Sequence, residues 1–207
     1  MAPSPVTTRP ASRPPRRLSR NARREQLIAA AVPVLTARGL TDFALEEIAA
    51  PADVTRNLLY HYFPRGRPDI VLAVLEHAGR ELTDGWVVDE AIPLGDRIAA
   101  NNARMVAHAM EPTDAWQLYR MARGSADPEI TATVERFLDV VIASMSLNHL
   151  GTADPPPVAR IALRGYFAFF ESVLDDARAA GMSSDEVLPL LGDTLVHALD
   201  VAGPPAP

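Results

Sequence analysis

The chain has 207 residues, 48% of them hydrophobic, and a net charge of −6, which excludes a wholly disordered protein and allows one large or two small domains. It has no cysteine, so disulfide bonds and thiolate metal sites are excluded. No apolar run approaches the roughly 18 residues that span a bilayer. The first 20 residues also lack the apolar centre of a secretory signal, so we expect a cytoplasmic protein that does not bind membranes.

The charge is divided unevenly along the chain. Residues 1–80 hold 12 arginines and 7 acidic residues, a net charge of +5, whereas residues 81–207 hold 8 and 19, a net charge of −11. Residues 1–20 are rich in proline, serine and arginine and predict a disordered basic arm of the kind that binds polyphosphate. An anionic membrane surface would also suit this arm, and a merely solvated tail is a further alternative.

The first helix is predicted from about residue 20 to residue 38. Apolar residues recur there at three- and four-residue steps, and Gly39 ends the pattern at a C-cap position. Pro33 falls inside this range and lacks a backbone donor, so a kink near Ala29 is expected.

A short second helix and a third follow after tight turns. The stretch FALEEIAA, residues 43–50, predicts an amphipathic helix that buries Leu45, Ile48 and Ala49. After PAD, a third helix opens at Thr55, which gives the order helix, turn, helix.

The third helix has one apolar face and one face that suits DNA. The apolar positions are Val54, Leu58, Leu59 and Phe63. The polar candidates for DNA binding are Thr55, Arg56, Asn57, Tyr60, His61 and Tyr62. A helix in the major groove presents such groups to base edges and phosphates, and an asparagine amide has the geometry that reads adenine. The alternative is an aromatic stripe that only packs in the core.

Residues 23–76, from RREQLIAAAV to DIVLAVLE, resemble the N-terminal domain of the tetracycline-repressor (TetR) family of bacterial regulators. The most specific piece is VTRNLLYHYF, which is similar to the family's recognition helix at nearly every position. The resemblance implies an all-α fold: a helix-turn-helix domain at 21–67, then a linking helix at about 68–82 within a ligand-binding and dimerisation domain that ends at 203. Residues 204–207 are expected to be a disordered tail. The family resemblance also implies that the protein represses transcription and that a small molecule relieves this repression.

Three departures from the family pattern bear on DNA binding. The second helix opens with FALEE, in which Ala44 cannot donate to a phosphate and Glu46 would repel one. The turn glycine is replaced by Asp53, although aspartate tolerates the left-handed conformation better than most residues. The usual serine-lysine pair is replaced by PRGRPD, so the phosphate contact would pass to Arg65 or Arg67. We expect the basic arm to enter the minor groove and supply part of the affinity.

Beyond residue 82 the sequence predicts five more helices and no strand. They are expected at about 94–109, 113–123, 127–149, 156–179 and 184–201. Ser183 and Glu186 fit a capping box at the start of the last helix, and Pro189 is expected to bend its early turns. The last two helices are apolar on two faces, which a monomer of this size cannot cover. A homodimer through 156–179 and 184–201 is therefore predicted, with a hetero-partner as the alternative.

Six residues are candidates for binding a ligand. They are Met105, His108, Trp116, Tyr119, Arg120 and Phe170. By the family resemblance they flank a mostly apolar pocket, which would suit a small hydrophobic molecule. The alternative is that Trp116 and Tyr119 are ordinary core residues and that His108 is a satisfied, partly buried histidine.

Catalysis is not indicated. The five histidines form no His-Glu-x-x-His pattern, RGSAD lacks the glycine spacing of a nucleophile elbow, and no glycine loop suited to phosphate is present. We therefore predict a homodimeric, ligand-responsive repressor of a pseudo-palindromic double-stranded DNA operator, with no catalytic or metal site and no cofactor. The alternative is a TetR-like helical dimer that has lost specific DNA binding and acts through protein partners.

Overall fold

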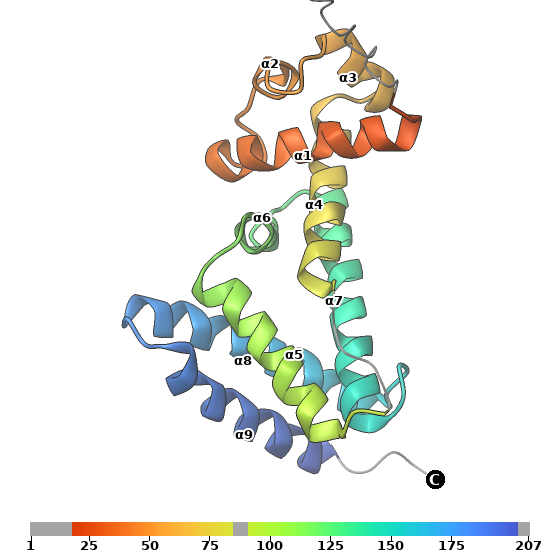
Figure 1. The fold of residues 1–207 in the computed structure, drawn as a ribbon. Helices are drawn as coiled ribbons and strands as arrows, with labels where there is room; N and C mark the ends of the chain where they lie inside the picture. The colour runs from red at the N-terminus through yellow and green to blue at the C-terminus, as the bar shows by residue number, and fades with distance from the viewer. Residues whose placement is uncertain (1–17, 85–90, 203–207) are drawn as a thin grey trace, which may run out of the picture.

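The computed structural model describes residues 18–84 and 91–202. The secondary structure within these ranges is helical, which confirms the predicted all-α fold (Figure 1). The helices are α1 (Arg20–Arg38), α2 (Leu45–Ala49), α3 (Arg56–Tyr62), α4 (Arg67–Thr83), α5 (Leu94–Met110), α6 (Asp114–Arg123), α7 (Pro128–Leu150), α8 (Pro157–Ala179) and α9 (Ser184–Ala202). Most of the predicted basic arm and the whole predicted tail lie outside the described residues.

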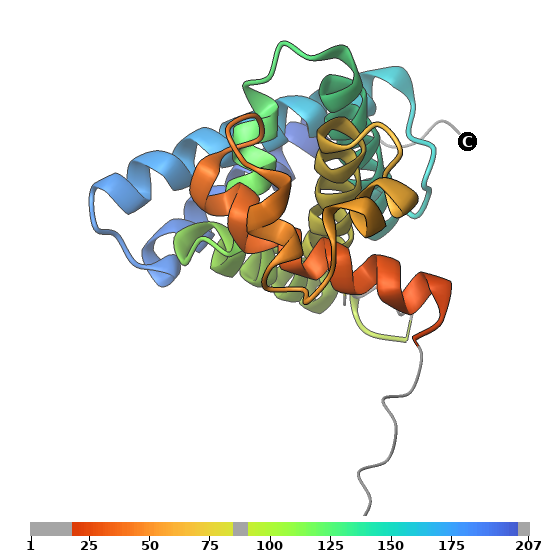
Figure 2. The same ribbon diagram turned by 90° about the horizontal axis from the view of Figure 1, so that it is seen from above.

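The helices form two groups joined by α4. Helices α1, α2 and α3 pack together at one end of the molecule, and α4 crosses α1 and leads away from them beside α7 (Figure 1). Viewed from above, the first three helices lie over the end of α4 (Figure 2). Helices α5, α8 and α9 pack together at the far end, and α6 lies between the groups, against both α4 and α1. Because α4 and α6 both pack against α1, changes at the far end can reach α1–α3 through these two helices.

The helical boundaries follow the apolar period of the sequence closely. Each of the five helices predicted beyond residue 82, and the linking helix, is observed within two residues of its expected ends. Helix α1 continues on both sides of Pro33, and the kink expected near Ala29 stays a prediction. Gly39 closes α1 with φ +87°, a backbone conformation that favours glycine.

The start of α9 has half of the predicted capping box. The Glu186 carboxylate accepts hydrogen bonds of 2.8 Å from both the backbone N–H and the hydroxyl of Ser183. These bonds lower the pKa of Glu186 below its usual value. Pro189 lies inside α9, five residues after the helix begins, where the helix continues past it.

No helix among the described residues is both long and apolar enough to cross a bilayer.

Candidate nucleic-acid interface and ligand cavity

Helix α3 is held in place by a small apolar core shared with α1 and α2. Leu59 and Phe63 are buried on its inner face, as predicted. Leu45, Ile48 and Ala49 of α2 are likewise buried, which confirms the amphipathic pattern of FALEEIAA. The outer face of α3 is therefore fixed in orientation by the burial of its inner face.

The turn between α2 and α3 uses Asp53 where glycine is usual. Its φ is +51°, the one positive φ of a non-glycine residue in the described chain. The backbone N–H of Asp53 donates to Ala50 O at 3.1 Å, and that of Val54 donates to Ala49 O at 3.0 Å. These bonds hold a compact turn, so the expected left-handed conformation at Asp53 is confirmed.

The polar face of α3 is largely open to solvent. Thr55, Arg56, Asn57, Tyr60 and His61 are exposed. Tyr62 is half-buried and packs against the core, with its ring edge-on to the His61 ring at 5.2 Å. Of the predicted DNA contacts on this helix, Tyr62 is thus the one that fits the packing alternative.

Arg56 is held by two neighbours on the exposed face. Its Nη1 lies 2.9 Å from Glu46 Oε1 of α2, and its Nη2 donates to the Tyr60 hydroxyl at 3.2 Å. The guanidinium carbon also lies 5.6 Å from the centre of the Tyr60 ring. The Tyr60 hydrogen bond and the Glu46 charge together raise the pKa of Arg56 above its ordinary value. Glu46 would therefore weaken phosphate binding in two ways, because it repels phosphate and also forms an ion pair with Arg56 of α3.

Arg65 connects the helix-turn-helix unit to the rest of the chain. Its Nε lies 2.6 Å from Asp69 Oδ1, and its Nη1 lies 2.9 Å from Glu129 Oε2 at the start of α7. The Glu129 and Asp69 hydrogen bonds raise the pKa of Arg65. A phosphate contact by Arg65 would require it to exchange one of these carboxylates.

The other candidate after α3, Arg67, stacks over an aromatic ring. Its guanidinium carbon lies 5.6 Å from the centre of the Phe43 ring. Between Arg65 and Arg67, Gly66 has φ +71°, and a Cβ atom there would lie 3.0 Å from the Tyr60 ring. Glycine at this position thus lets the Tyr60 ring approach the backbone.

A cleft of about 380 Å³ lies between α2, α3 and the start of α4. Its walls include four of the predicted DNA-binding residues: Arg56, Tyr60, Arg65 and Arg67. Glu46 is the acidic side chain in the same wall. Arg56 is paired with Glu46, and Arg65 with Asp69 and Glu129, so an anion such as a phosphate would bind in this cleft by exchange with one of these carboxylates.

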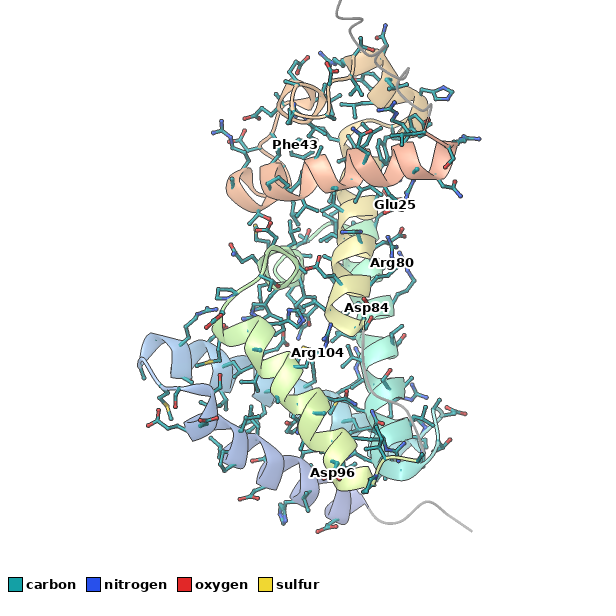
Figure 3. All side chains as sticks on the ribbon, in the orientation of Figure 1. Glu25, Phe43, Arg80, Asp84, Asp96 and Arg104 are labelled. Atoms are coloured by element: carbon teal, nitrogen blue, oxygen red, sulfur yellow. The ribbon has the colours of Figure 1, made fainter. Side chains whose placement is uncertain are left out.

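Glu25 of α1 ties the helix-turn-helix unit to α4. Its Oε2 lies 3.9 Å from Arg80 Nη2 and 3.8 Å from His77 Nδ1, both on α4, and Figure 3 shows Glu25 near Arg80. These long contacts, of which the one with His77 is charged only if the imidazole is protonated, contribute little stability. They lie where a movement of α4 would change the position of α1.

A second site is an apolar cavity at the far end, between α5, α7 and α8. Its free volume is about 30 Å³. The residues that line it include Met105, Met145, Asn148, His149, Tyr166 and Phe170. Met105 and Phe170 were predicted as ligand-binding residues. The other four were not predicted for this role, because nothing in their spacing separates a cavity wall from a packed core.

The four remaining predicted ligand residues lie outside this cavity. Trp116 and Tyr119 are 1% and 4% exposed and pack in the core, where the Tyr119 ring lies 4.8 Å from the Phe137 ring. His108 is half-buried, and its Nδ1 lies 3.4 Å from the Thr113 hydroxyl. The core alternative therefore describes Trp116 and Tyr119 in this structure.

Arg120, the last of these candidates, belongs to a partly buried ion network. Glu171 of α8 is buried and binds Arg120 at 2.8 Å and Arg123 at 3.1 Å. Arg120 also binds Asp175 at 2.5 Å. Burial, with a smaller contribution from Glu171, raises the pKa of the adjacent Tyr119. The network joins α6 to α8. Its residue Glu171 directly follows Phe170, which lines the cavity.

Comparisons with known proteins agree with this architecture. Residues 27–74 match the family model described as bacterial regulatory proteins, tetR family. A tetR-family transcriptional regulator from Streptomyces coelicolor has a TM-score of 0.69 and 23% sequence identity, over 89% of this chain and 83% of that one. A TetR-like transcriptional regulator from Rhodococcus sp. RHA1 has a TM-score of 0.66 and 18% identity, over 89% and 99%. The fatty acid degradation regulator FadR from Bacillus halodurans has a TM-score of 0.64 and 15% identity, over 84% and 97%.

Comparison with curated proteins gives no match. The solved structures share the fold, and the family model covers most of α1, all of α2 and α3, and about the first half of α4. Residues 27–74 are therefore similar to bacterial regulatory proteins of the tetR family, and the chain as a whole has the fold of the solved TetR-like regulators.

Proposed function

We propose that the protein is a homodimeric repressor that binds a pseudo-palindromic operator and that a small, largely apolar ligand releases from DNA. The observation that carries the proposal is the polar face of α3, which stands exposed on a helix fixed by its buried inner face. Thr55 and Asn57 lie near the N-terminus of α3, where a recognition helix contacts base edges. Arg56, Tyr60, Arg65 and Arg67 line the adjoining cleft, which suits phosphate.

The homodimer is supported by apolar side chains that remain exposed on the last two helices. Val158 and Ile161 of α8 are exposed, Ile161 to 70%, and Leu190 and Val196 of α9 are also exposed. A second copy would cover them, and an obligate interface of this kind buries on the order of 2,000 Å² or more. Two copies would carry two α3 helices to successive major grooves, about 34 to 36 Å apart.

Release by a ligand requires a physical connection between the cavity and the helix-turn-helix unit. The stacked rings of Phe167 and Phe170, 5.7 Å apart, form part of the cavity wall. Phe167 also lies 6.5 Å from Tyr119 of α6. Because α6 packs against both α4 and α1, a ligand that displaces these rings can shift the base of the helix-turn-helix unit.

The proposal is tested by selecting bound duplexes from random DNA at physiological salt with the purified full-length protein. The expected result is an enriched inverted repeat and a dimer by light scattering. Asn57→Ala is expected to relax the preference at one base position, and Tyr60→Phe to weaken binding to all sequences about equally, each by roughly 1 to 3 kcal/mol.

An absence of enrichment, or weak binding that salt abolishes, would contradict the repressor. That outcome would favour the second candidate, a helical dimer that acts through protein partners. The observation that favours this second candidate is that Arg56 and Arg65, both expected to bind phosphate, already form ion pairs with Glu46 and Glu129.

A further inference from the structure

The cavity between α5, α7 and α8 contains polar atoms without hydrogen-bond partners. The Tyr166 hydroxyl and the Asn148 Oδ1 atom have no partner among the described residues. Both side chains line the cavity, one from α8 and one from α7, and they are 4% and 3% exposed. An unpaired buried polar group is unfavourable, so a ligand that satisfies these two atoms gains affinity from both.

No acidic or basic side chain lines this cavity among the described residues apart from His149. Burial lowers the pKa of His149 to about 4, so its imidazole is neutral at neutral pH. A carboxylate or an ammonium group would therefore be buried without an opposite charge, which is strongly unfavourable. The wall thus selects against charged molecules.

Two further uncharged amides, Asn101 and Asn102, also line the cavity, and the aromatic part of its wall favours a flat, apolar body. The Phe167 and Phe170 rings are nearly parallel, with planes 14° apart. The free volume of about 30 Å³ is smaller than the cavity of about 150 Å³ that holds benzene in another protein. Met105 and Met145 also line the cavity, and unbranched thioether side chains are the ones that most readily move aside. A single ring with a short substituent is the size that such a movement would admit.

We propose that the effector is an uncharged molecule with one aromatic ring and a hydroxyl group. The hydroxyl donates to Asn148 Oδ1 and accepts from the Tyr166 hydroxyl, while the ring lies against Phe167 and Phe170. The assignment rests on the proposed function only in taking this cavity as the effector site. Its chemistry follows from the two unpaired atoms and the uncharged wall.

The test uses four probes that share a phenylethyl-sized body: 2-phenylethanol, phenylacetate, phenethylamine and ethylbenzene. Binding to the full-length protein is measured by calorimetry without DNA. 2-Phenylethanol is expected to bind at least about tenfold more tightly than ethylbenzene, since only the alcohol satisfies both polar atoms. Phenylacetate and the protonated amine are expected to bind more weakly than the alcohol. Tighter binding of either ion, or no binding of the alcohol at millimolar concentration, overturns the assignment.

Tyr166→Phe is expected to reduce the preference for the alcohol over ethylbenzene, because the alcohol keeps only its hydrogen bond to Asn148 Oδ1, while ethylbenzene still binds. Tyr119→Phe is the matched control, because it also removes a buried tyrosine hydroxyl but lies outside the cavity. It should leave the preference unchanged. An equal preference in wild type and the Tyr166 variant, with both folded by circular dichroism, would refute the polar contact.

DNA binding, measured separately by gel shift, distinguishes the two proposals. If the alcohol binds but does not change DNA binding, release by this ligand fails and the ligand assignment stands. If an inverted repeat is bound and the alcohol does not bind the protein, the assignment fails while the DNA-binding regulator stands.

Discussion

Replacing Glu46 with glutamine tests whether the ion pair with Glu46 of α2 keeps Arg56 of α3 from contacting a DNA phosphate. Glu46 Oε1 lies 2.9 Å from Arg56 Nη1, and both side chains are more than half exposed. The substitution removes the negative charge and keeps the shape of the side chain. Arg56 would then be free to contact a DNA phosphate, and that phosphate would no longer face a carboxylate. We expect Glu46→Gln to bind DNA more tightly than wild type.

The size of the effect follows from counterion release. One added phosphate contact makes the slope of log K against log[salt] steeper by about 0.9. If the added contact contributes nothing at 1 M salt, this slope corresponds to a gain in affinity of at most about 15-fold at 50 mM salt and about 4-fold at 200 mM salt. The wild-type pair is exposed and easily exchanged, so the measured gain should lie below these limits. The gain must shrink as salt rises.

The assay is fluorescence anisotropy with a labelled operator at several salt concentrations. Glu111→Gln is the control, since it removes the same charge at an exposed position at the end of α5. Equal affinities and equal salt slopes for wild type and Glu46→Gln would refute the reasoning. A gain in the control of the same size would show that net charge, rather than Arg56, is responsible.

Three further predictions concern stability and are checked by urea denaturation. Glu171→Ala should lower the free energy of unfolding by about 2 to 3 kcal/mol, below the full cost of breaking a buried pair because Arg120 and Arg123 are about one-third exposed; an unchanged midpoint would contradict this. The lowered pKa of His149, about 4, means that the unfolded chain binds its proton more readily. The contribution of His149 to the free energy of unfolding should therefore be complete above pH 6.5 and fall by up to about 3 kcal/mol as the pH drops towards 4. His149→Gln should make this fall shallower. An equally steep fall in that variant would contradict the role of His149. Asp53→Ala should cost roughly 1 kcal/mol and Asp53→Gly should not, because only alanine is strained at φ +51°; equal losses would count against the turn strain.

The apolar period of the sequence was sufficient to predict the helices. Burial on one side of a helix repeats every three to four residues, so the ends of α1 and α5–α9 could be found without knowledge of their neighbours. The same local signal predicted the buried Leu59 and Phe63, whereas the left-handed Asp53 was expected from the TetR resemblance, which places a turn glycine at that position. These are properties of a single segment and its nearest residues.

The pairing of charged side chains across helices was not predictable in this way. The sequence indicated that Glu46 would repel phosphate, but not that it would bind Arg56, ten residues away. It named Arg65 as a phosphate contact, while the fold places Glu129, 64 positions later, beside it. An arginine reaches several carboxylates in solution, and the packing of α4 against α7 selects which of them is near.

The residues that line the ligand cavity could not be predicted from the sequence alone, because they depend on how several helices pack. The sequence by itself determined an all-α chain, its helical segments and the polar face of α3, because each depends on the period of one helix. Which helix faces enclose a cavity depends on the rotation of α5, α7 and α8 about their axes, and these helices span residues 94–179. Packing of α6 against α4 and α7 turns Trp116 and Tyr119 into the core. That same tertiary packing leaves Asn148 and Tyr166, rather than the predicted aromatic residues of α6, as the side chains of the cavity that carry a polar atom without a hydrogen-bond partner.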